Sequence, residues 1–304
     1  MASPSDPRGL ADAARGRRVL VTGLSGFTGR YVGAALARRG YEPVGLARKD
    51  GSSLLLADQD GVREAVHRLR PDYVIHLAAV AFVAHADVGD FYATNILGTR
   101  NLLAALAAAD HAPQAVVLAS SANVYGNSRE VPLMEASAVA PSNDYAVSKL
   151  AMEHMARTWG ERLPITIVRP FNYTGVGQSD SFLVPKLVSH FVQRRSKVLL
   201  GNLDVARDFS DVRVVADVYA RLLEADSAGQ TFNICSSVPV SLAELLEKLE
   251  ALTDYRIQVE VDPALVRANE IKTLYGSAAK LRELFPDYAP VPIGETLQWM
   301  IESA

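Results

Sequence analysis

The sequence predicts an α/β protein built on a parallel β-sheet. Short apolar runs in the first half of the chain alternate with segments of helical periodicity. Strands and helices in strict alternation are typical of a parallel sheet with helices on both faces. The expected strands are residues 18–22, 41–47, 73–77, 115–119 and 165–168, and the expected helices are 31–39, 61–70, 94–109 and 145–159. We therefore expect a doubly wound, Rossmann-like sheet, which binds ligands beyond the carboxyl ends of its strands.

The length of 304 residues suggests two domains of about 150 residues each. The alternation weakens after Gly175, and an irregular stretch runs to Asp211. A helix at 214–225 and a strand at 231–235 then return to the sheet, followed by two or three helices and a strand at 255–261. We expect a flexible tail at 1–17, a sheet domain at 18–171 plus 209–235, and a smaller interleaved α/β lobe at 172–208 plus 236–304.

Composition excludes several classes of protein. Against 34 Asp and Glu there are 31 Lys and Arg, a net charge of −3, so we expect no nucleic-acid partner and no anionic membrane surface. The most apolar stretches, 73–83 and 102–109, are shorter than the roughly 20 residues of a membrane-spanning helix. The tail has no apolar stretch typical of a secretory signal. The single cysteine, Cys235, cannot form an internal disulfide, which favours a cytoplasmic location.

A glycine-rich turn follows the first strand directly. Residues 23–29 read GLSGFTG, with glycines three residues apart, and a helical segment comes next. In this context Gly23 allows a tight turn, Gly26 lets the backbone approach a pyrophosphate, and Gly29 lets the helix pack on the strand. The strand, turn and helix predict a dinucleotide site that includes Ser25, Phe27 and Thr28.

The end of the second strand indicates which dinucleotide binds. An acidic side chain there would bond the ribose 2′-hydroxyl and select NAD. Instead Ala47 is followed by Arg48 and Lys49, which offer positive charge to a 2′-phosphate. We therefore favour NADP(H), with Arg48 as its contact. The alternative is NAD(H), with Arg48 and Lys49 as solvated charges and Asp50 at the ribose.

Three residues suggest hydride chemistry. Tyr145 and Lys149 lie four residues apart on a predicted helix, so their side chains share one face. A nearby ammonium stabilises a tyrosine phenolate and brings its pKa towards the working range. Ser121 follows the strand at 115–119 and can donate a hydrogen bond to the same substrate oxygen. Together they suit the movement of a hydride to or from a carbon that bears oxygen.

The chain resembles the extended short-chain dehydrogenases/reductases. The segments that carry the resemblance are 22–29 (TGLSGFTG), 76–79 (HLAA), 120–126 (SSANVYG), 145–149 (YAVSK) and 169–172 (RPFN). The resemblance implies a catalytic triad of Ser121, Tyr145 and Lys149, and an Asn95 that supports the active-site helix. It also implies that Leu56, Ala78, Ala79 and Pro170 lie along the cofactor, with Tyr145 and Lys149.

Within this family the nucleotide-sugar branch is the most similar. Segments 172–178 (NYTGVGQ), 204–209 (DVARDF), 232–236 (FNICS) and 267–270 (RANE) are similar to the GDP-4-keto-6-deoxy-D-mannose reductases. The likeness implies that Ser121 and Asn172 contact the sugar and that Arg207 meets the diphosphate, a role that suits a guanidinium. Around the nucleotide it implies Phe182, Lys186, Arg267 and Glu270; solvated surface charge is the alternative for Lys186 and Glu270.

Several residues of this chain differ from those of related enzymes, and these differences limit the reactions and substrates that we expect. Related dehydratases carry an acid after the catalytic Ser or Thr, but Ala122 and Asn123 stand here, and neither transfers a proton. Relatives that epimerise C3 and C5 use a Cys and a His in the crevice, whereas Cys235 lies in another segment. Leu55 stands where the family often has an adenine-binding Asp. Tyr275 replaces an arginine typical of the GDP-linked reductases, which leaves thymine open as the base.

The function that these features favour is the NADPH-dependent reduction of the C4 keto group of a nucleotide-linked 4-keto-6-deoxyhexose, in deoxysugar biosynthesis for surface polysaccharide. Alternatives are a dTDP-4-keto-L-rhamnose reductase that gives 6-deoxy-L-talose or rhamnose, a nucleotide-sugar 4-epimerase, and a non-catalytic NADP(H)-sensing regulator.

We expect no metal site, because His76 fits a buried strand and no other histidine has a second ligand at metal spacing. Among the histidines, His85 is the candidate for a contact with the substrate. Helices at 101–109 and 145–155 could pair in a homodimer.

Overall fold

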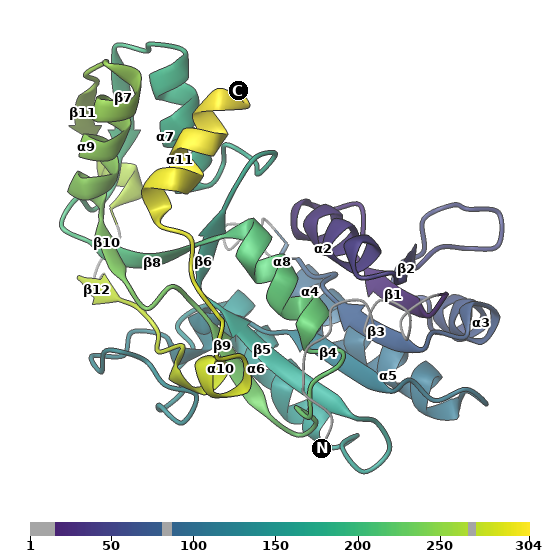
Figure 1. The fold of residues 1–304 in the computed structure, drawn as a ribbon. Helices are drawn as coiled ribbons and strands as arrows, with labels where there is room; N and C mark the ends of the chain where they lie inside the picture. The colour runs from purple at the N-terminus through teal and green to yellow at the C-terminus, as the bar shows by residue number, and fades with distance from the viewer. Residues whose placement is uncertain (1–15, 81–86, 267–271) are drawn as a thin grey trace. The chain divides into compact units, whose positions relative to one another are not determined.

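The computed structural model describes residues 16–80, 87–266 and 272–304 (Figure 1). The chain forms two compact units. The first takes in the described residues up to Val124, with Pro141–Arg169 and Ala216–Phe232. The second takes in Tyr125–Ala140, Pro170–Val215 and the described residues from Asn233 onward. Each unit is therefore assembled from segments that are distant in the sequence.

A six-stranded sheet carries the first unit. Its order is β2 (Glu42–Gly45), β1 (Arg18–Thr22), β3 (Tyr73–His76), β4 (Ala115–Ala119), β5 (Ile165–Pro170) and β9 (Thr231–Ile234). From β2 through β5 every neighbouring pair is parallel. The chain moves outward from β1 to β2, then returns past β1 to β3 and continues in the other direction. This order confirms the predicted doubly wound, Rossmann-like sheet.

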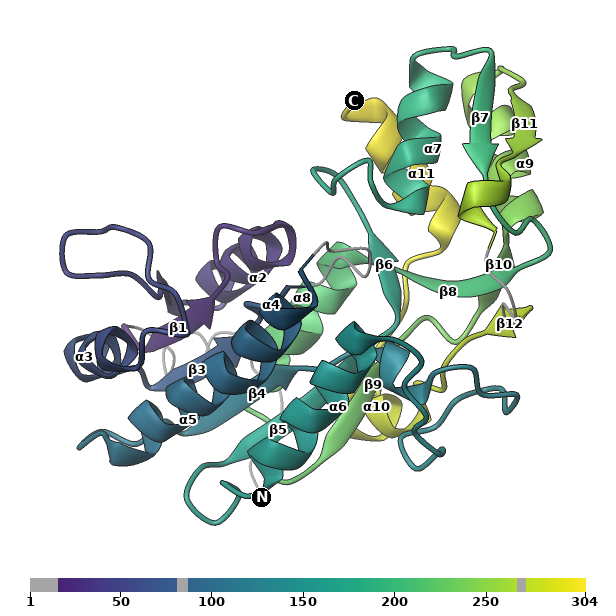
Figure 2. The same cartoon turned by 180° about the vertical axis from the view of Figure 1, so that it is seen from behind.

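Helices cover both faces of this sheet. On one face lie α2 (Phe27–Arg38) and the part of α8 (Val212–Arg221) that belongs to this unit (Figure 1). They are linked by an ion pair of 3.0 Å between Arg39 and Asp217. The other face carries α3 (Gln59–Leu69), α4 (Val88–Tyr92), α5 (Thr99–Ala108) and α6 (Asp144–Arg157), with α5 beside α6 (Figure 2).

The central strands are apolar throughout because both faces are covered. Val116, Val117 and Leu118 on β4 are fully buried, and so are Val74 and Ile75 on β3. Burial of a side chain of this size stabilises the fold by about 1.5 to 3 kcal/mol relative to exposure. The leucines of α5 complete the cluster on one side of the sheet: Leu102, Leu103 and Leu106. The strand positions that the apolar runs predict are therefore the core of this unit.

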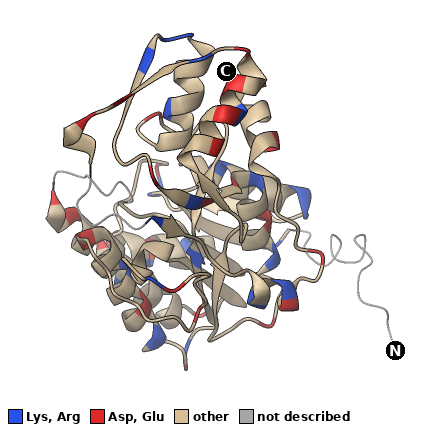
Figure 3. Ribbon diagram, turned by 90° about the vertical axis from the view of Figure 1, so that its left-hand side faces the viewer, with Lys and Arg blue, Asp and Glu red and all other residues tan. Residues whose placement is uncertain are grey.

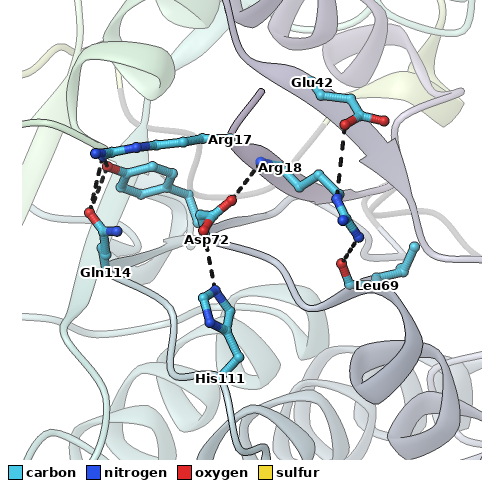
Figure 4. A network of polar contacts seen from close by, with 8 residues as sticks. Arg17, Arg18, Glu42, Leu69, Asp72, His111 and Gln114 are labelled. Atoms are coloured by element: carbon cyan, nitrogen blue, oxygen red, sulfur yellow. Dashed lines mark hydrogen bonds and ion pairs between the residues drawn. The ribbon is translucent and has the colours of Figure 1, made fainter. Parts of the chain in front are cut away.

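A polar network fixes the amino ends of β1 and β3 (Figure 4). Asp72 accepts from the backbone N–H of Arg18 at 2.8 Å and contacts the His111 ring at 3.2 Å. The Arg18 guanidinium donates to the carbonyl of Leu69 at 2.6 Å. These bonds support the register in which Val19 lies beside Tyr73. With the register fixed, the carboxyl ends of both strands reach the same edge.

Several boundaries differ from the prediction. Helix α2 begins at Phe27, inside the glycine motif, four residues before the expected start at Tyr31. The expected helix 94–109 is divided into a π-helical turn, η1 (Ala93–Gly98), and α5. A π-turn differs from an α-turn only in the partner of each N–H group, which side-chain periodicity does not record.

The second unit contains a four-stranded sheet and a two-stranded sheet. The strands of the first are β10 (Pro239–Ser241), β8 (Ala206–Asp211), β12 (Thr273–Leu274) and, paired with β8, β6 (Asn172–Thr174); β7 (Lys197–Leu200) and β11 (Gln258–Val261) form the second. Its helices are α7 (Leu183–Val192), α9 (Leu242–Thr253), α10 (Ala279–Leu284) and α11 (Ile293–Glu302). Short 3-10 turns occur at η2 (Ala122–Tyr125) and η3 (Pro263–Leu265).

The expectation of an irregular stretch up to Asp211 was wrong, because α7, β7 and β8 lie within it. Strand β8 reads ARDFSD, yet Asp208, Ser210 and Asp211 are buried. The Asp208 carboxylate accepts from the backbone N–H groups of Ser236 and Ser237, at 2.7 and 2.9 Å. Burial of Asp208 is tolerated because these partners come from elsewhere in the chain, and a polar strand of this kind gives no apolar signal.

We expect Glu153→Gln to destabilise the first unit by about 3 to 5 kcal/mol, because the buried Arg169 would lose its charge partner. Urea unfolding followed by circular dichroism measures the change. Asp217→Asn, which removes the part-exposed ion pair with Arg39, is the matched control and should cost less than about 1 kcal/mol. Equal losses in the two variants would contradict the importance of the buried pair.

Candidate active site

The glycine turn joins β1 to α2 with little space for side chains. Gly23 has a φ of +75°, and a Cβ there would lie 3.2 Å from the backbone nitrogen of Ala78. A Cβ on Gly29 would lie 2.1 Å from the Gly23 carbonyl oxygen, so only glycine fits. Gly26, which precedes α2, brings no side chain to the helix N-terminus, where a phosphate is favoured by backbone N–H groups. The turn thus has the form that a pyrophosphate site requires.

Arg48 lies just beyond β2, where the cofactor ribose is expected. Its guanidinium is half-exposed and pairs with the Asp58 carboxylate, which also caps α3 through the N–H of Gly61. Both contacts hold the pKa of Asp58 below its usual value, the Gly61 contact most strongly. A surface pocket at this position is lined by Ala47, Arg48, Lys49, Asp50, Gly61, Glu64, Ala65 and Arg68.

Asp50, the alternative ribose ligand, already accepts hydrogen bonds from Ser52. The hydroxyl and the backbone N–H of Ser52 lie 2.7 and 2.9 Å from its carboxylate. These bonds lower the pKa of Asp50, the hydroxyl bond most strongly. Leu56 is buried in the core beneath α5, whereas Leu55 is 73% exposed.

Of the three catalytic candidates, Ser121 follows the carboxyl end of β4 and Lys149 bonds to that end. Tyr145 and Lys149 lie on α6 and are 8% and 4% exposed. The Lys149 ammonium donates to the carbonyl of Ala119, the last residue of β4, at 2.7 Å. Ser121 follows two residues later, is 8% exposed, and its Oγ accepts from the backbone N–H of Asn123 at 3.2 Å. The structure therefore brings Lys149 to the strand end that carries Ser121.

Burial sets the charge state of these side chains. It lowers the pKa of Lys149 to about 8, although the Glu153 carboxylate acts in the opposite direction. The ammonium is thus still largely present at neutral pH, but it releases its proton far more readily than an exposed lysine. Burial, together with the charge of Lys149, lowers the pKa of His76 to about 3, so that imidazole is neutral.

A buried charge cluster lies one helical turn beyond Lys149. Glu153 is fully buried and accepts from the Ser120 hydroxyl at 2.6 Å and from Arg169 Nε and Nη2 at 2.8 and 2.6 Å. Burial alone would raise the pKa of Glu153, but the Arg169 bonds, followed by the Ser120 bond, hold it below its usual value. This cluster joins α6 to the ends of β4 and β5. Sequence reasoning missed Glu153, although its i+4 spacing from Lys149 was a signal.

Asn95, in the π-helical turn, contacts α6 and the loop after β3. Its Oδ1 accepts from the backbone N–H of Val80 at 3.1 Å, and its Nδ2 donates to the Ser148 hydroxyl at 2.9 Å. The Ser148 hydroxyl donates to the carbonyl of Tyr145 at 2.7 Å. Ala78 and Ala79 precede Val80 and are partly exposed.

Four predicted substrate residues belong to the second unit: Asn172, Phe182, Lys186 and Arg207. Asn172 donates to the carbonyl of Asp208 at 3.1 Å, and Arg207 donates to the carbonyl of Ala206 at 2.8 Å. Phe182 precedes α7 and is 40% exposed, while Lys186 donates to the carbonyl of Leu199 at 2.7 Å. Pro170 ends β5. Arg267, Glu270 and His85 lie outside the described residues.

Neither a membrane-spanning helix nor a metal cluster is found among residues 16–80, 87–266 and 272–304. No helix there is long and apolar enough to cross a bilayer, and no three His, Cys, Asp or Glu side chains there gather where they could hold a metal ion. Lys and Arg positions are interspersed with Asp and Glu positions in the view of Figure 3.

Comparisons with known proteins extend this description. The chain is 34% identical over 265 residues to GDP-6-deoxy-D-talose 4-dehydrogenase of Aggregatibacter actinomycetemcomitans, covering 87% of this chain and 90% of that protein. It is 36% identical over 278 residues to GDP-6-deoxy-D-mannose reductase of Pseudomonas aeruginosa, covering 88% and 90%. These relatives are nucleotide-sugar oxidoreductases, as the sequence resemblance predicts.

Solved structures are similar over nearly the whole chain. The structure of RMD from Pseudomonas aeruginosa complexed with NADPH has a TM-score of 0.84 at 33% identity, covering 94% of this chain and 97% of that one. A crystal structure from Burkholderia cenocepacia J2315 has a TM-score of 0.89 at 50% identity, covering 95% and 98%. Residues 19–235 match the NAD dependent epimerase/dehydratase family. The glycine turn, the Tyr145 and Lys149 pair and these likenesses agree, and the chain belongs to this extended short-chain dehydrogenase/reductase family.

Proposed function

We propose that this enzyme uses NADPH to reduce the C4 keto group of a nucleotide-linked 4-keto-6-deoxyhexose, with a GDP-linked sugar as its preferred substrate. One observation carries the proposal: Tyr145 and Lys149 lie buried on α6, and Lys149 bonds to the end of β4 beside Ser121. These residues belong to the same unit as the glycine turn. The two curated relatives, both named for GDP-6-deoxyhexose oxidoreduction, support the substrate class.

The chemistry divides between cofactor and protein. When bound, NADPH supplies the hydride that C4 accepts. The Tyr145 hydroxyl donates its proton to O4, so that the ketone becomes an alcohol and the tyrosine is left as phenolate. The Ser121 hydroxyl donates a hydrogen bond to O4 and polarises the carbonyl. The Lys149 ammonium stabilises the phenolate that Tyr145 becomes, which lowers the barrier to proton release.

The local residues favour reduction over the other reactions of the family. Ala122 is buried and Asn123 is exposed at the turn after Ser121, and neither side chain can act as the acid that dehydration needs. The Cys235 thiol is fully buried, and burial raises its pKa far above the usual range. A thiol that does not ionise cannot remove protons from C3 or C5.

NADP(H) is the favoured cofactor, with NAD(H) as the alternative. The similar structure from Pseudomonas aeruginosa holds NADPH. Arg48 supplies positive charge beyond β2, and its partner Asp58 leaves the guanidinium half-exposed. The carboxylate of Asp50, which would be needed for NAD, is engaged by Ser52.

The direction of the reaction and the nucleotide base of the substrate are the finer parts of this proposal. One relative is named as a 4-dehydrogenase, and the same residues would catalyse oxidation with Tyr145 as the base. Tyr275, where the GDP-linked reductases tend to have arginine, keeps a dTDP-linked sugar as the second candidate. A 4-epimerase and an NADP(H) sensor are the remaining alternatives, and only the sensor would bind cofactor without turnover.

We propose that the enzyme is a cytoplasmic homodimer paired through helices at 101–109 and 145–155. Val147 on α6 and Leu97 just before α5 are 38% and 56% exposed, and a second copy could cover them. The free thiol of the buried Cys235 agrees with a reducing compartment.

The direct test mixes the purified enzyme and NADPH with GDP-4-keto-6-deoxymannose or dTDP-4-keto-rhamnose, follows the loss of NADPH absorbance and identifies the product by NMR. We expect consumption with the GDP-linked sugar and a C4 alcohol as product. No consumption with either sugar would refute the proposed function.

Tyr145→Phe should abolish most of the turnover, by about 100-fold or more, because the proton donor is lost. NADPH binding, measured by fluorescence titration, should change by less than about threefold because the ring remains. Tyr92→Phe is the matched control, because it removes a hydroxyl on α4 that is bonded to Asp144, the residue next to Tyr145 on α6. Near-normal turnover of Tyr145→Phe would rule out Tyr145 as the donor.

Arg48→Ala should weaken NADPH binding by about tenfold or more, since a charge-assisted bond to the 2′-phosphate is worth about 1.5 to 3 kcal/mol. NADH binding should change by less than about twofold, because NADH lacks that phosphate. Calorimetric titration of both cofactors, with Lys49→Ala as the neighbouring control, measures the difference. Equal losses for the two cofactors would overturn the assignment.

The rate of reduction should fall as the pH rises above about 8 because Lys149, whose pKa is about 8, then loses the proton that stabilises the phenolate. Below that pH the ammonium is present and this contribution is complete. Steady-state kcat between pH 6 and 10 measures the effect. In Lys149→Arg the residual activity should not fall above about pH 8, because arginine keeps its charge. An unchanged fall in kcat at alkaline pH would mean that another group causes it.

A further inference from the structure

Five polar side chains form a buried row in the first unit that the proposed mechanism does not use. All are at most 2% exposed: Thr22, His76, Thr99, Asn95 and Ser148. Thr22 directly precedes the glycine turn, and Ser148 lies on α6 between the two catalytic candidates. Buried polar groups persist where they are hydrogen-bonded, and each of these has a partner in the row.

The bonds fix the direction of every donor in the first half of the row. The Thr99 hydroxyl donates its one hydrogen to the backbone carbonyl of Asn95 at 2.8 Å. It must therefore accept from His76 Nε2, 2.8 Å away. The ring then carries its proton on Nε2, and Nδ1 accepts from the Thr22 hydroxyl at 2.7 Å. Thr22 in turn accepts from the backbone N–H of Ala78 at 3.1 Å.

The second half of the row continues to the catalytic helix. Asn95 Nδ2 donates to the Ser148 hydroxyl at 2.9 Å, and that hydroxyl donates to the Tyr145 carbonyl at 2.7 Å. Asn95 lies in the π-helical turn η1, and insertions of this type are frequent at functional sites. The row thus runs from the backbone of Ala78 to the backbone of Tyr145.

The two ends of the row are the parts whose alignment matters. A Cβ on Gly23 would lie 3.2 Å from the Ala78 nitrogen, so these two backbone segments lie together at the turn where the cofactor is expected. Tyr145 is the proposed proton donor at the other end. Small misplacements of a reacting group have large effects on rate.

We propose that His76 is a positioning residue, a neutral imidazole with its proton on Nε2, which couples the glycine turn to the catalytic helix through Thr99 and Asn95. The proposal rests on the proposed function in taking Tyr145 as the proton donor. A protonated ring would have two donor nitrogens and could not accept from Thr22. The ring stays neutral at working pH because burial, with the nearby Lys149 charge, lowers the pKa of His76 to about 3.

Thr99→Val tests the coupling, because valine keeps the shape and removes the hydroxyl at the centre of the row. We expect kcat to fall by about tenfold or more and NADPH affinity by about threefold. The sugar KM should stay within about twofold, because the row does not reach the expected sugar contacts. The measurements are steady-state kinetics, fluorescence titration with NADPH and thermal unfolding.

Thr166→Val is the matched control. Thr166 is 1% exposed, and its hydroxyl bonds to the carbonyl and the hydroxyl of Ser227, at 2.9 and 2.8 Å, without a partner in the row. We expect it to lower the melting temperature about as much as Thr99→Val while kcat and NADPH affinity stay within about twofold of the parent. Equal kinetic effects in the two variants would overturn the coupling and leave a merely structural role.

The tautomer of His76 gives a test that does not depend on turnover. In 15N NMR of histidine-labelled enzyme, the signal that is lost in His76→Gln should show a protonated Nε2, a bare Nδ1 and no titration between pH 5 and 9. His76→Gln keeps a donor that can reach Thr99, so it should retain more activity than His76→Phe. A titrating ring, or a proton on Nδ1, would overturn the proposal.

The two proposals can fail separately. If the parent enzyme reduces neither sugar, the proposed function fails, and the positioning role is then decided by the tautomer and by the NADPH affinity of Thr99→Val against Thr166→Val. If the parent is active but Thr99→Val behaves like Thr166→Val, only the positioning role fails.

Discussion

The hydrogen bond from the Lys149 ammonium to the Ala119 carbonyl organises the candidate active site. It joins the first half of α6 to the last residue of β4 at 2.7 Å, and both ends are buried. The bond satisfies an ammonium that would otherwise be costly to bury, and it leaves two donor hydrogens for other partners. One contact therefore keeps the lysine inside the protein and sets where its positive charge acts.

Much of the surrounding architecture supports that contact. Glu153 lies one turn further along α6 and binds both Ser120 and Arg169, which ties the helix to two adjacent strands. At the other edge Asp72 holds the amino end of β1. Because a parallel sheet transmits register along its strands, bonds at the amino ends help to place the residues at the carboxyl ends. The candidate catalytic residues therefore depend on a scaffold that is held in place by contacts between residues distant in the sequence.

The sequence predicted the parallel sheet, and it placed Lys149 on the helix that meets the β4 end, because strands and helices give signals that are local in the chain. Apolar runs such as 115–119 mark buried strands, and Gly29 marks a contact that no Cβ tolerates. Strand β8 was missed because Asp208 and Asp211 carry no apolar pattern, and their burial depends on partners from elsewhere in the chain. Glu153 was missed because its role depends on Arg169, which is distant in the sequence. The π-helical turn was missed because it differs from an α-helix only in its backbone hydrogen bonds.

The buried thiol of Cys235 has a practical consequence for work on this protein. It is the single cysteine of the chain, its side chain is fully buried, and burial raises its pKa so that almost no thiolate forms at neutral pH. Maleimide reagents attack the thiolate, so the natural enzyme is close to a cysteine-free background. A fluorophore on one engineered surface cysteine would then report from that position alone, without removal of the native residue.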